Sequence, residues 1–141
     1  MQNLQNFKFL VIGLGSMGKR RIRNLLFHRI PKENIFGFDI RKDRNLEAGN
    51  KYGTKTFSTF KQALDNIDPQ VYIVSTPADV HYRYFLDALR QGKHFFVEHP
   101  VTDKGYKEIL SAKNKKIVMA PSCTLRFYPG VKLIKKILDQ K

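Results

Sequence analysis

Short apolar segments alternate with amphipathic segments along the whole chain. Apolar runs that predict strands lie at 7–13, 34–40, 54–58, 69–76, 93–99 and 115–122. Segments with the period of a helix lie between them, at 16–30, 43–53, 59–66, 78–92 and 103–114. Strands that are apolar on both faces and alternate with helices are typical of a parallel sheet with helices on both faces. The pattern therefore predicts a doubly wound, mainly parallel α/β fold.

Length and composition indicate one compact unit. The chain has 141 residues, of which 42% are hydrophobic and 11 are Phe, enough for the core of a single domain. No apolar stretch is long enough to cross a bilayer and the N-terminus is polar, so we expect a cytoplasmic protein without membrane contact. The single cysteine, Cys123, excludes an internal disulfide and is expected to be a small buried hydrophobe. No Cys/His cluster has metal-ligand spacing, so no metal site is predicted.

The net charge of +14 raises the question of nucleic-acid binding, since 26 Lys and Arg face 12 Asp and Glu. The positive charge is spread from "GKRRIR" through "KNKK" to "KLIKK", without the interleaved aromatic residues that stack on bases. Nucleic acid is therefore an unlikely partner. The basic surface would favour an anionic small molecule such as a sugar phosphate or a nucleotide sugar, or be balanced by a further domain.

The first strand-to-helix turn, "VIGLGSMGKR", carries the strongest chemical signal. Gly13, Gly15 and Gly18 form G-x-G-x-x-G between a strand and a helix. In that context the first glycine permits the tight turn, the second lets the backbone approach a pyrophosphate, and the third lets the helix pack closely on the strand. Ser16 and Met17 open the helix, whose free N–H groups attract phosphate. The turn predicts dinucleotide binding.

Asp39 is predicted to select the dinucleotide. It stands at the end of the second strand, 21 residues after Gly18, where a carboxylate accepts hydrogen bonds from the adenosine ribose. The carboxylate would repel the 2′-phosphate of NADP, whereas Arg41, Lys42 and Arg44 nearby could neutralise it. Because the carboxylate is nearest to the ribose, we expect NAD as the cofactor, with NADP the less favoured alternative.

Three motifs together resemble a known family, the glucose-fructose oxidoreductase, inositol dehydrogenase and MocA group of NAD(P)-dependent oxidoreductases. They are "VIGLGSMGKR", the stretch "VYIVSTPADVHYRYFLDALRQGKHFFVEHP", and "LRFYP", and the resemblance that rests on them covers nearly the whole chain. The resemblance implies a Rossmann domain with Thr76, Pro77 and His81 near the nicotinamide half of the cofactor and Glu98 beside its ribose. It also implies a larger C-terminal α/β domain that carries substrate and subunit contacts.

The residues themselves support these positions less strongly. Ser75, Thr76, Glu98 and His99 end predicted parallel strands, and ligands of such sheets bind at the carboxyl ends of the strands. His81 has two interpretations. It is either a surface or capping histidine of the helix that follows, or it lies near the cofactor as the resemblance implies.

His99 departs from the family signature, which has a lysine between the glutamate and the proline. A lysine there hydrogen-bonds the substrate oxygen during hydride transfer. Histidine is shorter and titrates at about 6.5 rather than about 10.4, so it can both accept and donate a proton near neutrality. Three roles stay open for His99: general acid and base, a binding residue without chemistry, or a purely structural residue.

The last helical segment, residues 126–141, places Val131, Ile134, Ile137 and Leu138 on one side. This apolar face either lies on the sheet or begins a second domain. We divide the chain into a dinucleotide-binding domain, residues 1–122, and a segment, residues 123–141, that leads toward a substrate domain absent from this chain. A homo-oligomer is expected only together with that domain.

Two functional classes follow. The first is an oxidoreductase that transfers a hydride between a nicotinamide cofactor and a hydroxyl or carbonyl of a sugar, polyol or nucleotide sugar. The second is a dinucleotide-binding module without turnover. The 141 residues alone are not expected to turn over substrate, because a single Rossmann domain leaves one side of the pocket open to water.

Overall fold

The computed structural model describes residues 4–99, 103–112 and 116–140. Within these ranges one parallel sheet has the strand order β3-β2-β1-β4-β5-β6. The strands are β1 (Phe9–Ile12), β2 (Ile35–Phe38), β3 (Lys55–Phe57), β4 (Val71–Val74), β5 (His94–Val97) and β6 (Met119–Pro121). The α-helices are α1 (Ser16–Phe27), α2 (Lys42–Tyr52), α3 (Phe60–Asn66), α4 (His81–Arg90), α5 (Tyr106–Ser111) and α6 (Pro129–Leu138). The described residues also form the 3₁₀ turns η1 (Leu4–Asn6), η2 (Lys32–Asn34), η3 (Ala78–Val80) and η4 (Thr124–Phe127).

The strand order contains a topological switch point. The chain proceeds outward from β1 to β2 and β3, crosses back through α3, and continues from β4, which pairs with β1 on its other side. In such sheets the crevice for a ligand lies outside the carboxyl ends of the strands at this point. The fold confirms the predicted doubly wound α/β class.

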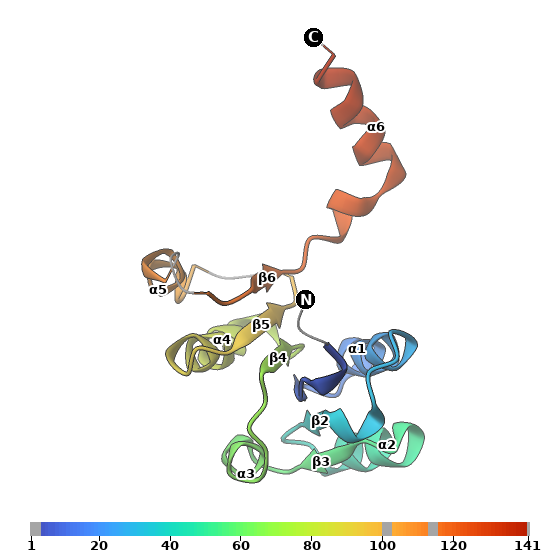
Figure 1. The fold of residues 1–141 in the computed structure, drawn as a ribbon, viewed down its shortest axis with the longest axis vertical. Helices are drawn as coiled ribbons and strands as arrows, with labels where there is room; N and C mark the ends of the chain where they lie inside the picture. Colours follow the sequence, from blue (N-terminus) through green and yellow to red (C-terminus); the bar gives the residue numbers. More distant parts are fainter. Residues whose placement is uncertain (1–3, 100–102, 113–115, 141) are drawn as a thin grey trace.

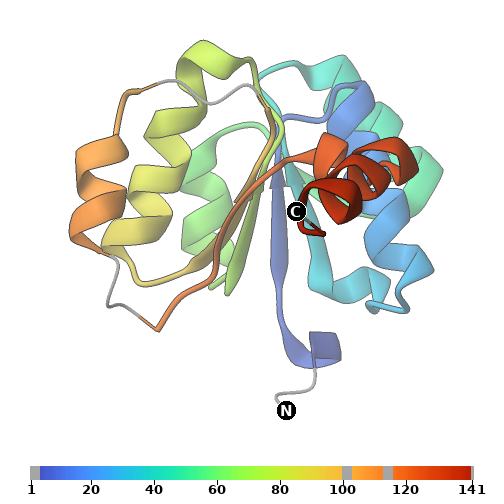
Figure 2. The same ribbon diagram turned by 90° about the horizontal axis from the view of Figure 1, so that it is seen from above.

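Two layers of helices cover the sheet. Figure 2 shows α1 and α2 on one side of it and α3, α4 and α5 on the other. Consecutive strand residues supply the two cores, so that Leu10 belongs to the core under α3 and α4, whereas Val11 belongs to the core under α1. Both residues are fully buried. Strands buried on both faces explain why the sequence reads as continuous apolar runs.

The regular elements are shorter than the sequence predicted. The predicted strand 69–76 contracts to Val71–Val74, and the predicted strand 93–99 contracts to His94–Val97. The predicted helix 78–92 begins as the 3₁₀ turn η3 before α4. The polar residues Ser75 and Glu98 directly follow the shortened strands, and their N–H groups still donate to the carbonyls of Ile12 and Val74.

The C-terminal segment leaves the sheet after β6. Figure 1 shows α6 extending away from the other elements. None of its described residues is buried, and Val131, Ile134, Ile137 and Leu138 are each 42% to 62% exposed. The alternative that this helix lies on the sheet is therefore wrong. The expectation of a buried Cys123 is also wrong, because Cys123 lies beyond β6 where no element covers it, and it is exposed.

Within the described ranges, no helix combines the length and the hydropathy that crossing a bilayer requires.

Candidate functional site

The glycine turn between β1 and α1 has no room for side chains at two of its positions. Gly13 has a φ of +87°, and a Cβ there would lie 2.8 Å from the backbone of Ser75 and Thr76. A Cβ on Gly18 would lie 1.8 Å from the carbonyl oxygen of Gly13. The turn is also tied to β2, since the Gly13 N–H donates to the carbonyl of Phe38 at 2.8 Å. Glycine is therefore required at both ends of this turn.

The middle of the turn is open. A Cβ on Gly15 would meet only the flexible guanidinium of Arg44, at 3.6 Å. Ser16 and Met17 are exposed and form the first residues of α1. Backbone N–H groups at the start of this helix thus face accessible space, which is the arrangement that binds phosphate.

Asp39 lies directly after β2 and is held in place by backbone donors. It is 4% exposed. Its Oδ2 accepts from the N–H of Leu14 at 2.7 Å, and its Oδ1 accepts from the N–H of Arg41 at 2.9 Å. The amide of Asn45 donates to the carbonyl of Asp39 at 2.7 Å. The carboxylate is thus fixed beside the glycine turn before any ligand arrives.

The arginines near Asp39 differ in their freedom. Arg41 forms a two-bond contact with Asp43, with 2.5 Å between Nη2 and Oδ2. The hydrogen bond from Arg41 holds the pKa of the Asp43 carboxyl below its usual range. Arg44 instead lies over Gly15, with its Nη1 3.4 Å from Oδ2 of Asp39. Of these two, Arg44 is therefore the cation that lies beside the Asp39 carboxylate.

The end of β4 contains polar atoms without partners. Within the described part of the chain, the buried Ser75 Oγ, Thr76 Oγ1 and His81 Nδ1 form no hydrogen bond. The backbone here is well anchored, since the N–H of Ser75 donates to the carbonyl of Ile12 at 2.7 Å. Buried polar groups that lack partners indicate a place where a ligand or water completes the structure.

His81 is a buried support of this strand end. It is 1% exposed, so the interpretation as a surface histidine is wrong. Its Nε2 lies 2.6 Å from the carbonyl oxygen of Thr76. A carbonyl only accepts, so Nε2 is the donor of this hydrogen bond. His81 therefore holds the Thr76 backbone.

Glu98 follows β5 and pairs with a residue that the sequence did not suggest. It is 7% exposed, and its oxygens accept from Nε and Nη2 of Arg21 at 2.5 Å and 2.9 Å. Arg21 projects from α1, and its guanidinium lies 4.6 Å from the ring centre of Phe96. The partners are 77 positions apart, and no local pattern connects them. His99 comes next and is exposed.

A cavity of about 400 Å³ lies at the carboxyl ends of the strands. It brings together six of the residues predicted from the sequence: Gly13, Asp39, Arg41, Ser75, Thr76 and Pro77. Its wall also includes Arg83 and Tyr84 of α4, which the sequence reasoning missed. Burial raises the pKa of the Tyr84 hydroxyl. The sequence did contain a pattern that could have identified them. Val80, Arg83 and Tyr84 are spaced three and four positions apart, which places them on one face of a helix.

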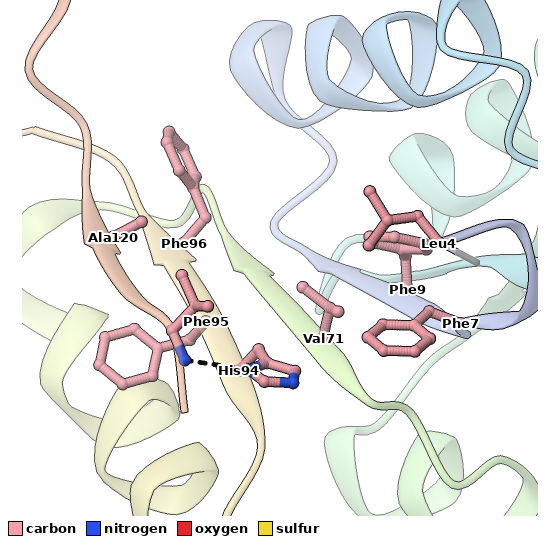
Figure 3. A pocket seen from close by; sticks show the side chains of 9 residues that line it. Leu4, Phe7, Phe9, Val71, His94, Phe95, Phe96 and Ala120 are labelled. Atoms are coloured by element: carbon pink, nitrogen blue, oxygen red, sulfur yellow. Dashed lines mark hydrogen bonds between the residues drawn. The ribbon is translucent and has the colours of Figure 1, made fainter. Parts of the chain in front are cut away.

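A second cavity, of about 340 Å³, lies at the opposite end of the sheet, next to the amino ends of β1, β4 and β5. Figure 3 shows its wall of apolar side chains, among them Phe7, Phe9 and Val71. His94 is the one polar side chain lining it within the described residues, and its Nδ1 already accepts from the N–H of Val118 at 2.9 Å. This groove lacks the charged and hydrogen-bonding groups that a dinucleotide needs.

The comparisons with known proteins agree with this geometry. The model of the GFO_IDH_MocA family, described as an oxidoreductase family with an NAD-binding Rossmann fold, matches residues 7–121. The inositol 2-dehydrogenase of Burkholderia cenocepacia is 28% identical over 137 residues, which cover 92% of this chain and 40% of that protein. Human biliverdin reductase A is 30% identical over 103 residues, which cover 70% of this chain and 32% of that protein.

Two solved structures show how far the similarity of fold extends. The WlbA dehydrogenase from Bordetella pertussis, in complex with NADH and UDP-GlcNAcA, matches 95% of this chain and 41% of its own with a TM-score of 0.83 at 19% identity. Levoglucosan dehydrogenase, in complex with NADH and levoglucosan, matches 95% of this chain and 39% of its own with a TM-score of 0.74 at 25% identity. The chain thus spans about two fifths of the length of these proteins.

Proposed function

Since the chain belongs to the GFO_IDH_MocA family of oxidoreductases with an NAD-binding Rossmann fold, we propose that it binds NAD across the carboxyl ends of β2, β1, β4 and β5. The predictions of fold, family and cofactor are confirmed by the family match and the sheet. One observation supports the proposed site most. The glycine turn packs against the end of β4 with no space for a Cβ, beside a fixed carboxylate at the end of β2.

The local charges favour NAD over NADP. The Asp39 carboxylate is buried and held by two N–H groups, so it cannot turn away from a 2′-phosphate. Two negative groups at such close range repel strongly where water is excluded. Arg41 is engaged by Asp43, which leaves Arg44 as the cation beside Asp39. Asp39 should therefore accept the ribose hydroxyls of NAD and disfavour the phosphate of NADP.

The proposed reaction is oxidation of a sugar, polyol or nucleotide-sugar hydroxyl, or the reverse reduction. The named substrates of the similar dehydrogenases, inositol, levoglucosan and UDP-GlcNAcA, support this class. NAD supplies the hydride acceptor when it is bound. His99, directly after Glu98 at the end of β5, then takes the proton from the substrate hydroxyl as the carbon loses its hydride. Glu98 holds the nicotinamide ribose, as the family resemblance implies.

Substrate contacts are proposed to come from a further domain, because the chain spans about two fifths of its relatives. The exposed apolar face of α6, which has no partner among the described residues, is consistent with residues 123–141 leading into such a domain. Subunit contacts through that domain and a cytoplasmic location stay predictions.

Calorimetric titration with NAD and NADP tests the site. In Asp39→Ala, the affinity for NAD should fall about 10- to 100-fold, because hydrogen bonds to a charged acceptor are lost, while the affinity for NADP should change much less. Asp65→Ala, an exposed carboxylate of α3, serves as the control for the change in charge. Equal losses of NAD and NADP affinity in Asp39→Ala would argue against a ribose contact.

A second function, cofactor binding without turnover, is favoured by one observation: histidine stands where the family signature has lysine. The two functions separate in a protein that carries this chain with its substrate domain. His99→Ala should lower kcat about 10²- to 10⁴-fold with little change in NAD affinity, and His99→Lys should retain activity with a higher pH optimum. Unchanged turnover in His99→Ala would place the proton-transfer group elsewhere.

A further inference from the structure

Arg21, the ion-pair partner of Glu98, has no role in the function proposed above. The pair is bidentate, and the side chains of its partners are only 18% and 10% exposed. Removing a charge from water costs several kcal/mol. The attraction between the two side chains must first offset this cost, so stabilising the fold is a weak explanation for the pair. Its position, between the helix of the glycine turn and the end of β5, suggests a role in the site.

The guanidinium of Arg21 is fixed from two directions. Nε and Nη2 donate to the two oxygens of Glu98, and the guanidinium carbon lies over the ring of Phe96 at 4.6 Å from its centre. Each carboxylate oxygen has a second lone pair, so Glu98 retains the capacity to accept two more hydrogen bonds. The carboxylate is therefore held rigidly without being saturated.

Glu98 depends on this cation. Both oxygens of its carboxylate are held by the Arg21 guanidinium, so without Arg21 the side chain would be free to turn toward solvent. A carboxylate that turned away could no longer accept from two neighbouring hydroxyl groups. The N–H of Glu98 is bonded to the carbonyl of Val74 at 3.0 Å, so the backbone at this position is already fixed and the side chain is what Arg21 controls.

Resting on the proposed function, we propose that Arg21 is a positioning residue for the nicotinamide half of the cofactor. It keeps the Glu98 carboxylate oriented toward the second ribose, and so contributes to the affinity for that ribose alone. The adenosine half, held by the glycine turn and Asp39, does not depend on it.

The test compares three ligands, ADP, ADP-ribose and NAD, by calorimetry on this chain. ADP lacks the second ribose, so the ratio of ADP-ribose to ADP affinity isolates the contribution of that ribose. In Arg21→Met this ratio should fall about 5- to 20-fold, the loss expected when one charge-assisted contact to a ligand is weakened, while ADP affinity changes less than about twofold. Arg21→Lys should restore part of the ratio. Arg20→Met, an exposed neighbour on α1, controls for net charge and should change neither quantity.

A double-mutant cycle separates positioning from general structural support. Glu98→Gln should lower the ratio as Arg21→Met does, and Arg21→Met added to Glu98→Gln should lower it no further. The double variant contains no unpaired buried charge, so it decides the question even if Arg21→Met alone fails to fold. Additive losses, or equal losses for ADP and ADP-ribose, would overturn the inference. Absence of ADP and NAD binding by the unmodified chain would instead overturn the proposed function.

Discussion

The two halves of the proposed cofactor site differ in how complete they are without a ligand. In the adenosine half, the N–H groups of Gly13 and Leu14 and both oxygens of Asp39 have partners within the protein. The protein itself holds these groups in place, so this half should bind with little rearrangement.

The proposed nicotinamide half differs, because it contains polar atoms without partners. Within the described residues, Ser75 Oγ, Thr76 Oγ1 and His81 Nδ1 are buried and unpaired. Each such group costs free energy until a ligand or water supplies a partner. The comparison suggests that the two halves contribute differently to binding. The adenosine half gives most of the affinity for the cofactor, and the nicotinamide half gains hydrogen bonds only when the reactive part of the cofactor is present.

Breaking the anchor should have the largest effect. In Gly18→Ala, the new Cβ would lie 1.8 Å from the carbonyl oxygen of Gly13, so the turn or the helix must move. We expect a loss of about 3 kcal/mol in the free energy of unfolding and at least a 100-fold loss of NAD affinity. Thermal unfolding and calorimetry measure the two. Gly130→Ala, where a Cβ meets nothing within 4 Å, is the control and should change neither. Normal NAD binding by Gly18→Ala would contradict the account.

His81→Phe should have the next largest effect, on the nicotinamide side. The ring fills similar space but cannot donate to the carbonyl of Thr76, which His81 Nε2 now contacts at 2.6 Å. Leaving a buried carbonyl unpaired should cost about 1 to 3 kcal/mol of unfolding free energy. Denaturant unfolding measures this loss. The ADP affinity should be nearly unchanged, and a large fall in ADP affinity would show that the two halves are not separate.

Thr76→Val should have opposite effects on stability and binding. It removes a buried hydroxyl that has no partner in the described structure, so the unfolding free energy should rise by about 1 kcal/mol. NAD affinity should fall several-fold while ADP affinity stays the same, if the hydroxyl serves the nicotinamide half. A lower melting temperature of Thr76→Val, or an unchanged NAD affinity, would show that the Thr76 hydroxyl does not hydrogen-bond the cofactor.

The smallest effect concerns a pair outside both halves. Lys93 hydrogen-bonds Asp68, which lowers the pKa of that carboxyl from its ordinary value of 3.8. The contribution of this ion pair to the free energy of unfolding is therefore present above pH 3.8 and is lost as the pH falls through the lowered pKa. Melting curves of the native chain and Asp68→Asn should converge as the pH falls below 3.8 and through the lowered pKa, with or without NAD. A ligand-dependent difference would connect this pair to the site.

The two halves also differ in how well the sequence predicted them. The glycine turn and Asp39 are encoded within one strand-helix-strand unit, because turn geometry needs glycine at fixed positions whatever the rest of the chain does. Arg21 and Glu98 meet across 77 positions, through the packing of α1 beside β5. No local period reports such a contact. The two interpretations of His81 stayed open for the same reason: its position in the first turn of a helix does not reveal that its Nε2 contacts the carbonyl oxygen of Thr76.

Direct titration of this chain with NAD, ADP and nicotinamide mononucleotide tests the central claim, that NAD binds at the carboxyl ends of the strands and is anchored through its adenosine half. The account predicts measurable NAD binding, retention of most of that binding free energy by ADP, and much weaker binding of nicotinamide mononucleotide. No heat with millimolar NAD, or nicotinamide mononucleotide binding more tightly than ADP, would contradict it.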